Sequence, residues 1–165
     1  NMETQQENPY FLFPGALYVS SKPMQITTVL GSCVAICLYD PVKHIGGMNH
    51  FMLPLWNGKG LASPKHGNIA ISKLIDQMVS AGALKRNLKA KVFGGGIVIQ
   101  TQSAQFNIGK KNIDLAFRLL EQEGIPVIAS STGGNHGRKI LYDTYTGKVK
   151  QKIINNIHEV DQINK

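Results

Sequence analysis

The sequence is poor in cysteine and tryptophan and contains no long apolar run. Its 165 residues include two cysteines and one tryptophan. Two cysteines four positions apart in one strand cannot easily bridge, so they predict free thiols in a reducing cytoplasm rather than a disulfide framework. No stretch approaches the ~18 to 20 apolar residues of a membrane span, and no basic segment followed by an apolar one opens the chain. These absences predict a soluble cytoplasmic protein without membrane insertion.

Signals for cofactors and metals are also missing. Gly94, Gly95 and Gly96 lack the spacing of a dinucleotide fingerprint, and no Gly-Lys-Ser/Thr follows them. The cysteines and histidines do not have metal-ligand spacing. We therefore expect no cofactor and no metal, and we interpret the three glycines as a place of close backbone approach or a bulge.

The net charge of +8 is unevenly distributed. Residues 1–60 carry three basic and three acidic residues, whereas residues 61–165 carry fifteen basic and seven acidic residues. A basic half favours an acidic partner. Because the lysines are scattered, with few aromatic residues among them and no nucleic-acid motif, we expect an acidic protein surface and no nucleic acid.

Hydrophobic content of 42% is ordinary globular composition, and the periodicity predicts one α+β domain over residues 10–154 with flexible tails at 1–9 and 155–165. The spacing of apolar residues predicts helices over 68–82 and 110–123. Strands are predicted at 15–20, 26–30, 34–39, 51–55, 89–99, 125–130, 139–145 and 148–154.

The stretch from residue 27 to residue 54 holds both cysteines and two of the five histidines. Cys33 follows Gly31 and Ser32 at the start of one apolar run, and His50 opens another. The intervening segment Asp-Pro-Val-Lys-His contains residues typical of turns, so the two apolar runs predict a β-hairpin. In that hairpin Cys33 and His50 lie near the open ends of adjacent strands, which is the minimum arrangement for a cysteine nucleophile and its base.

Each of these residues also has a purely structural interpretation. A lone cysteine in an apolar run is usually a small buried hydrophobe, which describes Cys37 well. Cys33 differs because it sits at the mouth of its strand. His50 can be a structural histidine or the base for Cys33, and Thr27 can be a simple strand former or the group that orients the His50 ring.

The chain contains GSCVA at 31–35, GGMNHFMLP at 46–54, AKVFGG at 90–95 and glycine pairs near Gly133 and Gly147. In these segments it resembles the CheD family, the bacterial chemoreceptor glutamine deamidases. The likeness covers roughly residues 13–152, and the GGMNHFMLP run is its most specific part. The sequence departs from the family pattern at Ser131-Thr132, Lys65-His66-Gly67 and Gly96, none of which belongs to the expected catalytic residues.

The resemblance implies a site made of Cys33, His50 and Thr27. We further predict that Ser32, Gly31 and Asn49 bind the substrate or its oxyanion. It also implies packed mixed β-sheets with outer helices, as in the cytotoxic necrotising toxin deamidases. The implied substrates are glutamines on the cytoplasmic domain of methyl-accepting chemotaxis receptors. Members of the family also tend to bind CheC, a phosphatase of the phosphorylated response regulator.

Two other functions use the same residues. The chain can be a binding module that docks and stimulates a CheC-type phosphatase with little turnover of its own. It can also hydrolyse receptor glutamyl methyl esters, a reaction that differs from deamidation only in the leaving group. Fast reaction of Cys33 with a thiol probe, governed by an unusually low pKa, separates an enzyme from a binding module.

Overall fold

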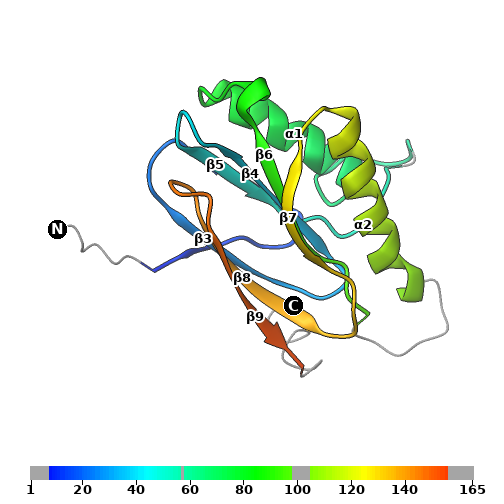
Figure 1. Cartoon of the computed structure of the whole chain (residues 1–165). Helices are drawn as coiled ribbons and strands as arrows, with labels where there is room; N and C mark the ends of the chain where they lie inside the picture. The colour runs from blue at the N-terminus through cyan, green and yellow to red at the C-terminus, as the bar shows by residue number, and fades with distance from the viewer. Residues whose placement is uncertain (1–7, 57, 98–104, 156–165) are drawn as a thin grey trace.

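Three layers make up the protein, as seen in a computed structural model that describes residues 8–56, 58–97 and 105–155. A four-stranded sheet packs on one face of a five-stranded sheet, and two helices cover the other face (Figure 1). This arrangement confirms the predicted α+β class with outer helices. The predicted tails fall almost entirely outside the described residues.

The five-stranded sheet has the order β2-β5-β4-β6-β7, and the four-stranded sheet has the order β1-β3-β8-β9. The strands are β1 (Tyr10–Phe11), β2 (Leu17–Ser20), β3 (Gln25–Leu30), β4 (Val34–Asp40), β5 (Ile45–Asn49), β6 (Lys89–Gly94), β7 (Val127–Thr132), β8 (Gly137–Asp143) and β9 (Val149–Ile154). The predicted strands at 15–20 and 26–30 lie in different sheets, so the turn between them carries the chain from one layer to the other.

The helices α1 (Gly67–Ser80) and α2 (Gln105–Gln122) agree with the predicted periodicity, although α2 begins five residues earlier than expected. Their apolar faces pack on the side of the five-stranded sheet that carries Val34, Ile36 and Leu38. Gly82 (φ 114°) follows the end of α1, and a short 3₁₀ turn at Lys85–Asn87 leads into β6. Within the described part of the chain, neither helix is long and apolar enough to cross a membrane.

The predicted hairpin forms, but its second strand lies earlier in the chain than expected. β5 ends just before His50, and Phe51 makes only an isolated bridge to Val34. The strand predicted at 51–55 left Gly46 and Gly47 outside any strand, yet both lie inside β5. A Cβ on Gly46 would stand 2.6 Å from the Tyr142 hydroxyl, and one on Gly47 would stand 2.6 Å from Val19. The two glycines are therefore required by close packing on both faces of the strand.

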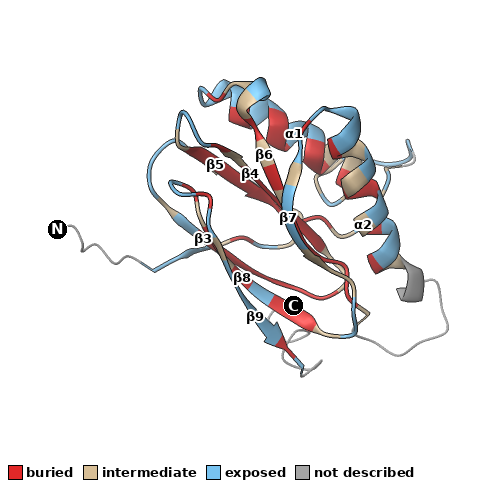
Figure 2. Ribbon diagram, viewed as in Figure 1, coloured by how far each residue is buried: buried red, intermediate tan, exposed pale blue. Residues whose placement is uncertain are grey.

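The core between the two sheets holds both cysteines. Cys37 is buried in it and Cys33 packs partly against it, as the period of two along a strand predicts. Figure 2 shows that the strands in the middle of both sheets are buried, whereas β7 and β9 are largely exposed. Cys33 thus lies at one end of the inter-sheet layer and Cys37 lies about 13 Å further along β4.

Candidate active site

The strand register places Cys33 and His50 on the same face of the five-stranded sheet. Cys37 pairs with Met48, and the bridge between Val34 and Phe51 continues the same register. His50 therefore lies opposite Ala35, and Cys33 is its diagonal neighbour, at a spacing of roughly 7 Å. Both side chains face the four-stranded sheet. The strand register thus brings Cys33 and His50 to one face of adjacent strands, as the sequence predicts.

The His50 ring is fully buried and is held through one nitrogen. Thr28 lies on β3, and its Oγ1 is 2.7 Å from His50 Nδ1. The same hydroxyl donates to the carbonyl of Leu12 at 2.7 Å. Because its only hydrogen is directed at Leu12, Thr28 accepts the Nδ1 proton of His50. This leaves the lone pair on Nε2, which has no hydrogen-bond partner among the described residues.

Burial keeps both candidate catalytic groups neutral in the free protein. It lowers the pKa of His50 to about 4, opposed by the nearby Leu12 carbonyl. It also raises the pKa of the Cys33 thiol to about 11, only partly offset by the Cys33 backbone N–H. No hydrogen bond joins the thiol to the ring in the described part of the chain. An unusually low thiol pKa, the property named above as separating an enzyme from a binding module, is therefore not found in the free protein.

Thr27, the residue expected to orient His50, points the other way. Its hydroxyl donates to the carbonyl of Ile140 on β8 at 2.8 Å. Alternate residues of a strand face opposite sides, and Ile26, Thr28 and Leu30 face the inter-sheet core. The structure thus corrects the predicted contact by one position, from Thr27 to Thr28.

The turn before Cys33 is fixed by three separate hydrogen bonds to its carbonyls. Gly31 accepts from the N–H of Gly96 at 2.9 Å, and Cys33 accepts from the N–H of Gly95 at 2.8 Å. Between them, Ser32 accepts from the side-chain amide of Asn112 at 3.1 Å. Three successive peptide groups are therefore held in place at the point where the thiol enters the sheet.

Asn112 on α2 also ties the two candidate catalytic segments together. Its amide nitrogen donates to Met52, two residues after His50, at 3.1 Å as well as to Ser32. Asn112 is fully buried, and its Oδ1 has no partner within the described residues. The side chain therefore couples the helix layer to both ends of the site.

The three consecutive glycines serve the close backbone approach that the sequence predicts. A Cβ on Gly94 (φ 108°) would stand 2.2 Å from the carbonyl oxygen of Cys33. Gly96 is similarly enclosed, 2.5 Å from the carbonyl oxygen of His136. The loop that follows β6 can therefore approach the Cys33 turn only because it lacks side chains.

A buried arginine secures the same loops from the other side. Arg138 is only 2% exposed, and its guanidinium donates to Ser131 Oγ at 3.1 Å and to the carbonyl of Gly133 at 2.8 Å. Gly133 in turn donates its N–H to Gly94. Arg138 thus supports, through two loops, the glycines that hold the Cys33 turn.

Asn49 does not face the site. Its Oδ1 accepts the backbone N–H of Ile36 at 2.9 Å, on the helix side of the sheet. The side chain is fully buried there, on the opposite face from Cys33 and His50. Asn49 therefore supports the strand pairing and does not line the space where a substrate would reach the thiol.

Sequence reasoning missed the structural parts played by Thr28, Asn112 and Arg138. The position of Thr28 could have been found from strand periodicity, since it shares a face with Leu30 in the predicted strand. Asn112 and Arg138 act across helix and loop contacts that no local pattern shows. Within the described ranges, no group of three or more His, Cys, Asp and Glu side chains could hold a metal ion.

Replacing Thr28 with valine is expected to lower turnover more than replacing Thr27 with valine. The Thr28 hydroxyl holds Nδ1 of His50, and loss of a buried hydrogen bond typically costs about 1–3 kcal/mol, or roughly 5- to 150-fold in rate. The effect should fall on kcat rather than KM. Thr27→Val, the matched control on the other face of β3, should stay within about threefold. Equal losses in both variants would contradict the assignment.

The protein is expected to lose stability as the pH falls from 6.5 towards 4. The pKa of His50 is about 4 in the folded chain and near 6.5 when exposed, so the unfolded state binds more protons in this window. The stabilisation is complete above pH 6.5 and amounts to roughly 3 kcal/mol. Urea unfolding of the wild type and His50→Gln should show this extra pH dependence in the wild type alone.

Alkylation of Cys33 by iodoacetamide is expected to accelerate roughly tenfold per pH unit from pH 7 to pH 10, because the thiolate is the nucleophile and the pKa of Cys33 is about 11. Cys37 is fully buried and should react far more slowly. Mass spectrometry of the two cysteine peptides measures both rates. A plateau in the Cys33 rate near neutral pH would show a preformed thiolate–imidazolium pair instead.

Comparisons with known proteins agree on one family. The family described as "CheD chemotactic sensory transduction" matches residues 52–153. A "Probable chemoreceptor glutamine deamidase CheD" of Trichlorobacter lovleyi is 54% identical over 151 residues, covering 90% of this chain and 94% of that protein. A protein of the same name from Sulfurimonas denitrificans is 47% identical over 146 residues, covering 87% of this chain and 93% of that protein.

Among solved structures, the crystal structure of the Bacillus licheniformis hypothetical protein YfiH is similar with a TM-score of 0.47 and 16% identity. The similarity covers 70% of this chain and 49% of that chain.

Proposed function

The chain belongs to the CheD family, and from this premise we propose that it deamidates glutamine side chains of methyl-accepting chemotaxis receptors, with Cys33 as nucleophile. The observation that carries the proposal is the placement of Cys33 and His50 on one face, with Nδ1 of the ring held and Nε2 without a partner among the described residues. A neutral imidazole in this tautomer can accept a thiol proton.

In the first step, His50 Nε2 takes the Cys33 proton as the sulfur attacks the glutamine side-chain carbonyl carbon. Because both groups are neutral in the free protein, proton transfer accompanies the attack and does not precede it. The backbone N–H of Cys33, beside the sulfur, is one donor for the oxyanion, and the N–H of Ser32 is the second. One such donor is typically worth roughly 3 kcal/mol.

In the second step, the imidazolium gives its proton to the departing amine, which leaves as ammonia. A γ-glutamyl thioester on Cys33 remains. The buried imidazolium is a stronger acid than a solvent-exposed one, because burial disfavours its charged form, and this favours proton transfer to the amine. His50 then deprotonates a water molecule, which attacks the thioester and releases glutamate with the thiol restored.

The surrounding structure explains how these groups stay in position. Thr28 orients the ring, and Gly95, Gly96 and Asn112 fix the peptide groups of the Cys33 turn. These parts come from the four-stranded sheet, the loop after β6 and α2. The proposed site therefore depends on all three layers, and Thr27 has no direct place in it.

The proposed substrate is the cytoplasmic domain of the receptors, which places the reaction in the cytoplasm. A CheC-type phosphatase is a second proposed partner, on the basis of family membership. An acidic surface on either partner would complement the basic second half of the chain.

Incubation of the purified chain with a receptor cytoplasmic fragment tests the function. Tryptic peptides analysed by mass spectrometry should show glutamine converted to glutamate at a small number of positions, with ammonia released in equal amount. A folded chain that converts no glutamine in an intact receptor fragment would overturn the proposal. Hydrolysis of glutamyl methyl esters at a higher rate than amides would point to the esterase reaction instead.

A further inference from the structure

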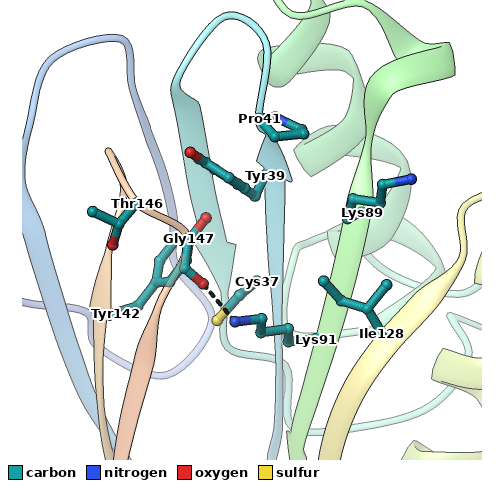
Figure 3. Close-up of a pocket in the computed structure, with 9 residues that line it drawn as sticks. All are labelled: Cys37, Tyr39, Pro41, Lys89, Lys91, Ile128, Tyr142, Thr146 and Gly147. Atoms are coloured by element: carbon teal, nitrogen blue, oxygen red, sulfur yellow. Dashed lines mark hydrogen bonds between the residues drawn. The ribbon is translucent and has the colours of Figure 1, made fainter.

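A cavity lies at the end of the molecule opposite the Cys33 turn. It has a volume of about 230 Å³, and its floor is formed by Cys37 and Tyr142 (Figure 3). Cys37 is four residues beyond Cys33 on β4, a separation of about 13 Å along the strand. The cavity therefore belongs to a region separate from the proposed catalytic residues.

The cavity exists because the four-stranded sheet covers only part of its partner. The turn between β8 and β9 packs on β4, where a Cβ on Gly147 would stand 2.5 Å from the Tyr39 ring. Lys91 on β6 donates to the carbonyl of Gly147 at 2.7 Å and closes that side. Beyond this contact, the inner face of β6 and β7 stays open.

A bulge in β7 places an apolar side chain at the edge of this opening. The pairing of β6 with β7 shifts between Ala90 and Lys91, so Ile128 is the extra residue. Bulges commonly re-aim a side chain in this way. Ile128 lines the cavity and is nevertheless 56% exposed. Val42 and Tyr145, in the two turns at the same end of the molecule, are also exposed.

Both charged side chains that line the cavity are basic. Lys89 and Lys91 line it, and no acidic side chain does so among the described residues. Lys91 is bonded to Gly147, whereas Lys89 points away from that turn (Figure 3). Two carboxylates lie close to Tyr39 but do not line the cavity. Asp40 accepts from the backbone N–H groups of residues 42, 43 and 84, and Asp143 Oδ1 accepts from those of residues 145 and 146.

We propose that this cavity is a docking site for an acidic segment of a partner protein, which inserts one apolar side chain between Ile128 and Tyr39. The volume suits one large side chain, because cavities for whole small ligands usually span about 300–1,000 Å³. A carboxylate beside that side chain pairs with Lys89. The bulge in β7 disfavours addition of a further strand, so the segment binds through its side chains.

A selection from a phage library of random linear peptides tests this site. The biotinylated full-length chain serves as bait, and Lys89→Glu serves for counter-selection. We expect enriched peptides in which acidic residues flank a leucine, isoleucine or aromatic residue. Enriched peptides without this pattern, or no enrichment over the Lys89→Glu chain, would overturn the proposal.

Fluorescence anisotropy of the best peptide then locates the contact. Lys89→Glu and Ile128→Ser should each weaken binding at least tenfold, and Lys152→Glu, the matched control on the exposed outer face of β9, should change it less than about twofold. Equal losses in Lys89→Glu and Lys152→Glu would reduce the interaction to non-specific charge and contradict the site. Circular dichroism confirms that each variant is folded.

Three further measurements separate the docking site from the catalytic residues and from a small-anion site. Cys33→Ala should bind the peptide as tightly as the wild type, and Lys89→Glu should deamidate a receptor fragment at the wild-type rate. A negative result in the peptide-binding experiments would therefore not contradict the proposed deamidase activity. Sodium benzoate tests whether the cavity is a small-anion site. If benzoate displaces the peptide at benzoate concentrations well below the Kd of the peptide, the cavity binds small anions and the proposal of a protein partner is wrong.

Discussion

Cys33→Ala is expected to lower glutamine deamidation by at least roughly 10⁴-fold while the protein stays folded. The sulfur forms the bond to the substrate, and neither the neighbouring glycines nor water can replace it in a thioester mechanism. Cys33 is only partly buried, so the loss of its sulfur leaves a small gap at the edge of the inter-sheet core. The expected readout is loss of Gln-to-Glu conversion in receptor peptides with an unchanged thermal unfolding curve.

Cys37→Ala is the matched control for this variant. Both cysteines lie on the same face of β4, but Cys37 is fully buried and burial raises its thiol pKa strongly. Its replacement should reduce stability by about 1 kcal/mol and leave the rate per folded molecule within about threefold. Loss of turnover in Cys37→Ala with retention in Cys33→Ala would reverse the assignment of the nucleophile.

His50→Gln is expected to reduce kcat by roughly 10²- to 10⁴-fold, the usual contribution of a positioned general base. Glutamine can keep a hydrogen bond to Thr28 but cannot accept the Cys33 proton or protonate the departing amine. Because the thiol pKa is about 11 in the folded chain, the residual rate should rise with pH as thiolate forms without the base.

The pH profile distinguishes a base from a structural histidine. In the wild type, deamidation should fall only below about pH 4 to 5, where the His50 ring takes up a proton. In His50→Gln, the residual rate should instead increase continuously towards pH 10. A variant whose pH profile simply parallels that of the wild type would show that His50 acts only through the fold.

Local sequence patterns predicted the helices and the final hairpin because both depend on short-range periodicity. The second strand of the β4–β5 hairpin was misplaced, since it was assigned to the apolar run at 51–55 and not to the segment that contains Gly46 and Gly47. Their real requirement comes from Tyr142 and Val19, which lie far away in sequence and in two different sheets. Only the tertiary packing shows why glycine is needed within that strand.

In the candidate site, too, local sequence patterns predicted some contacts, whereas others depend on residues far apart in the sequence. Cys33 and His50 were placed together because a hairpin brings them into one register. The choice between Thr27 and Thr28 depended on which face of β3 meets the other sheet, and a single residue reverses that face. The raised pKa of Cys33 could not be predicted either, because it follows from burial between two sheets.

Covalent labelling by a substrate analogue tests the central claim most directly. A receptor peptide that carries a diazoketone analogue of glutamine at a modified position would place its ketone where the amide carbonyl normally binds and its reactive carbon in place of the amide nitrogen. Peptide mapping of the labelled chain should find one adduct on Cys33, slowed by His50→Gln and prevented by excess unmodified peptide. Labelling of Cys37, or no labelling of Cys33 in a chain that still converts glutamine, would contradict the proposed nucleophile.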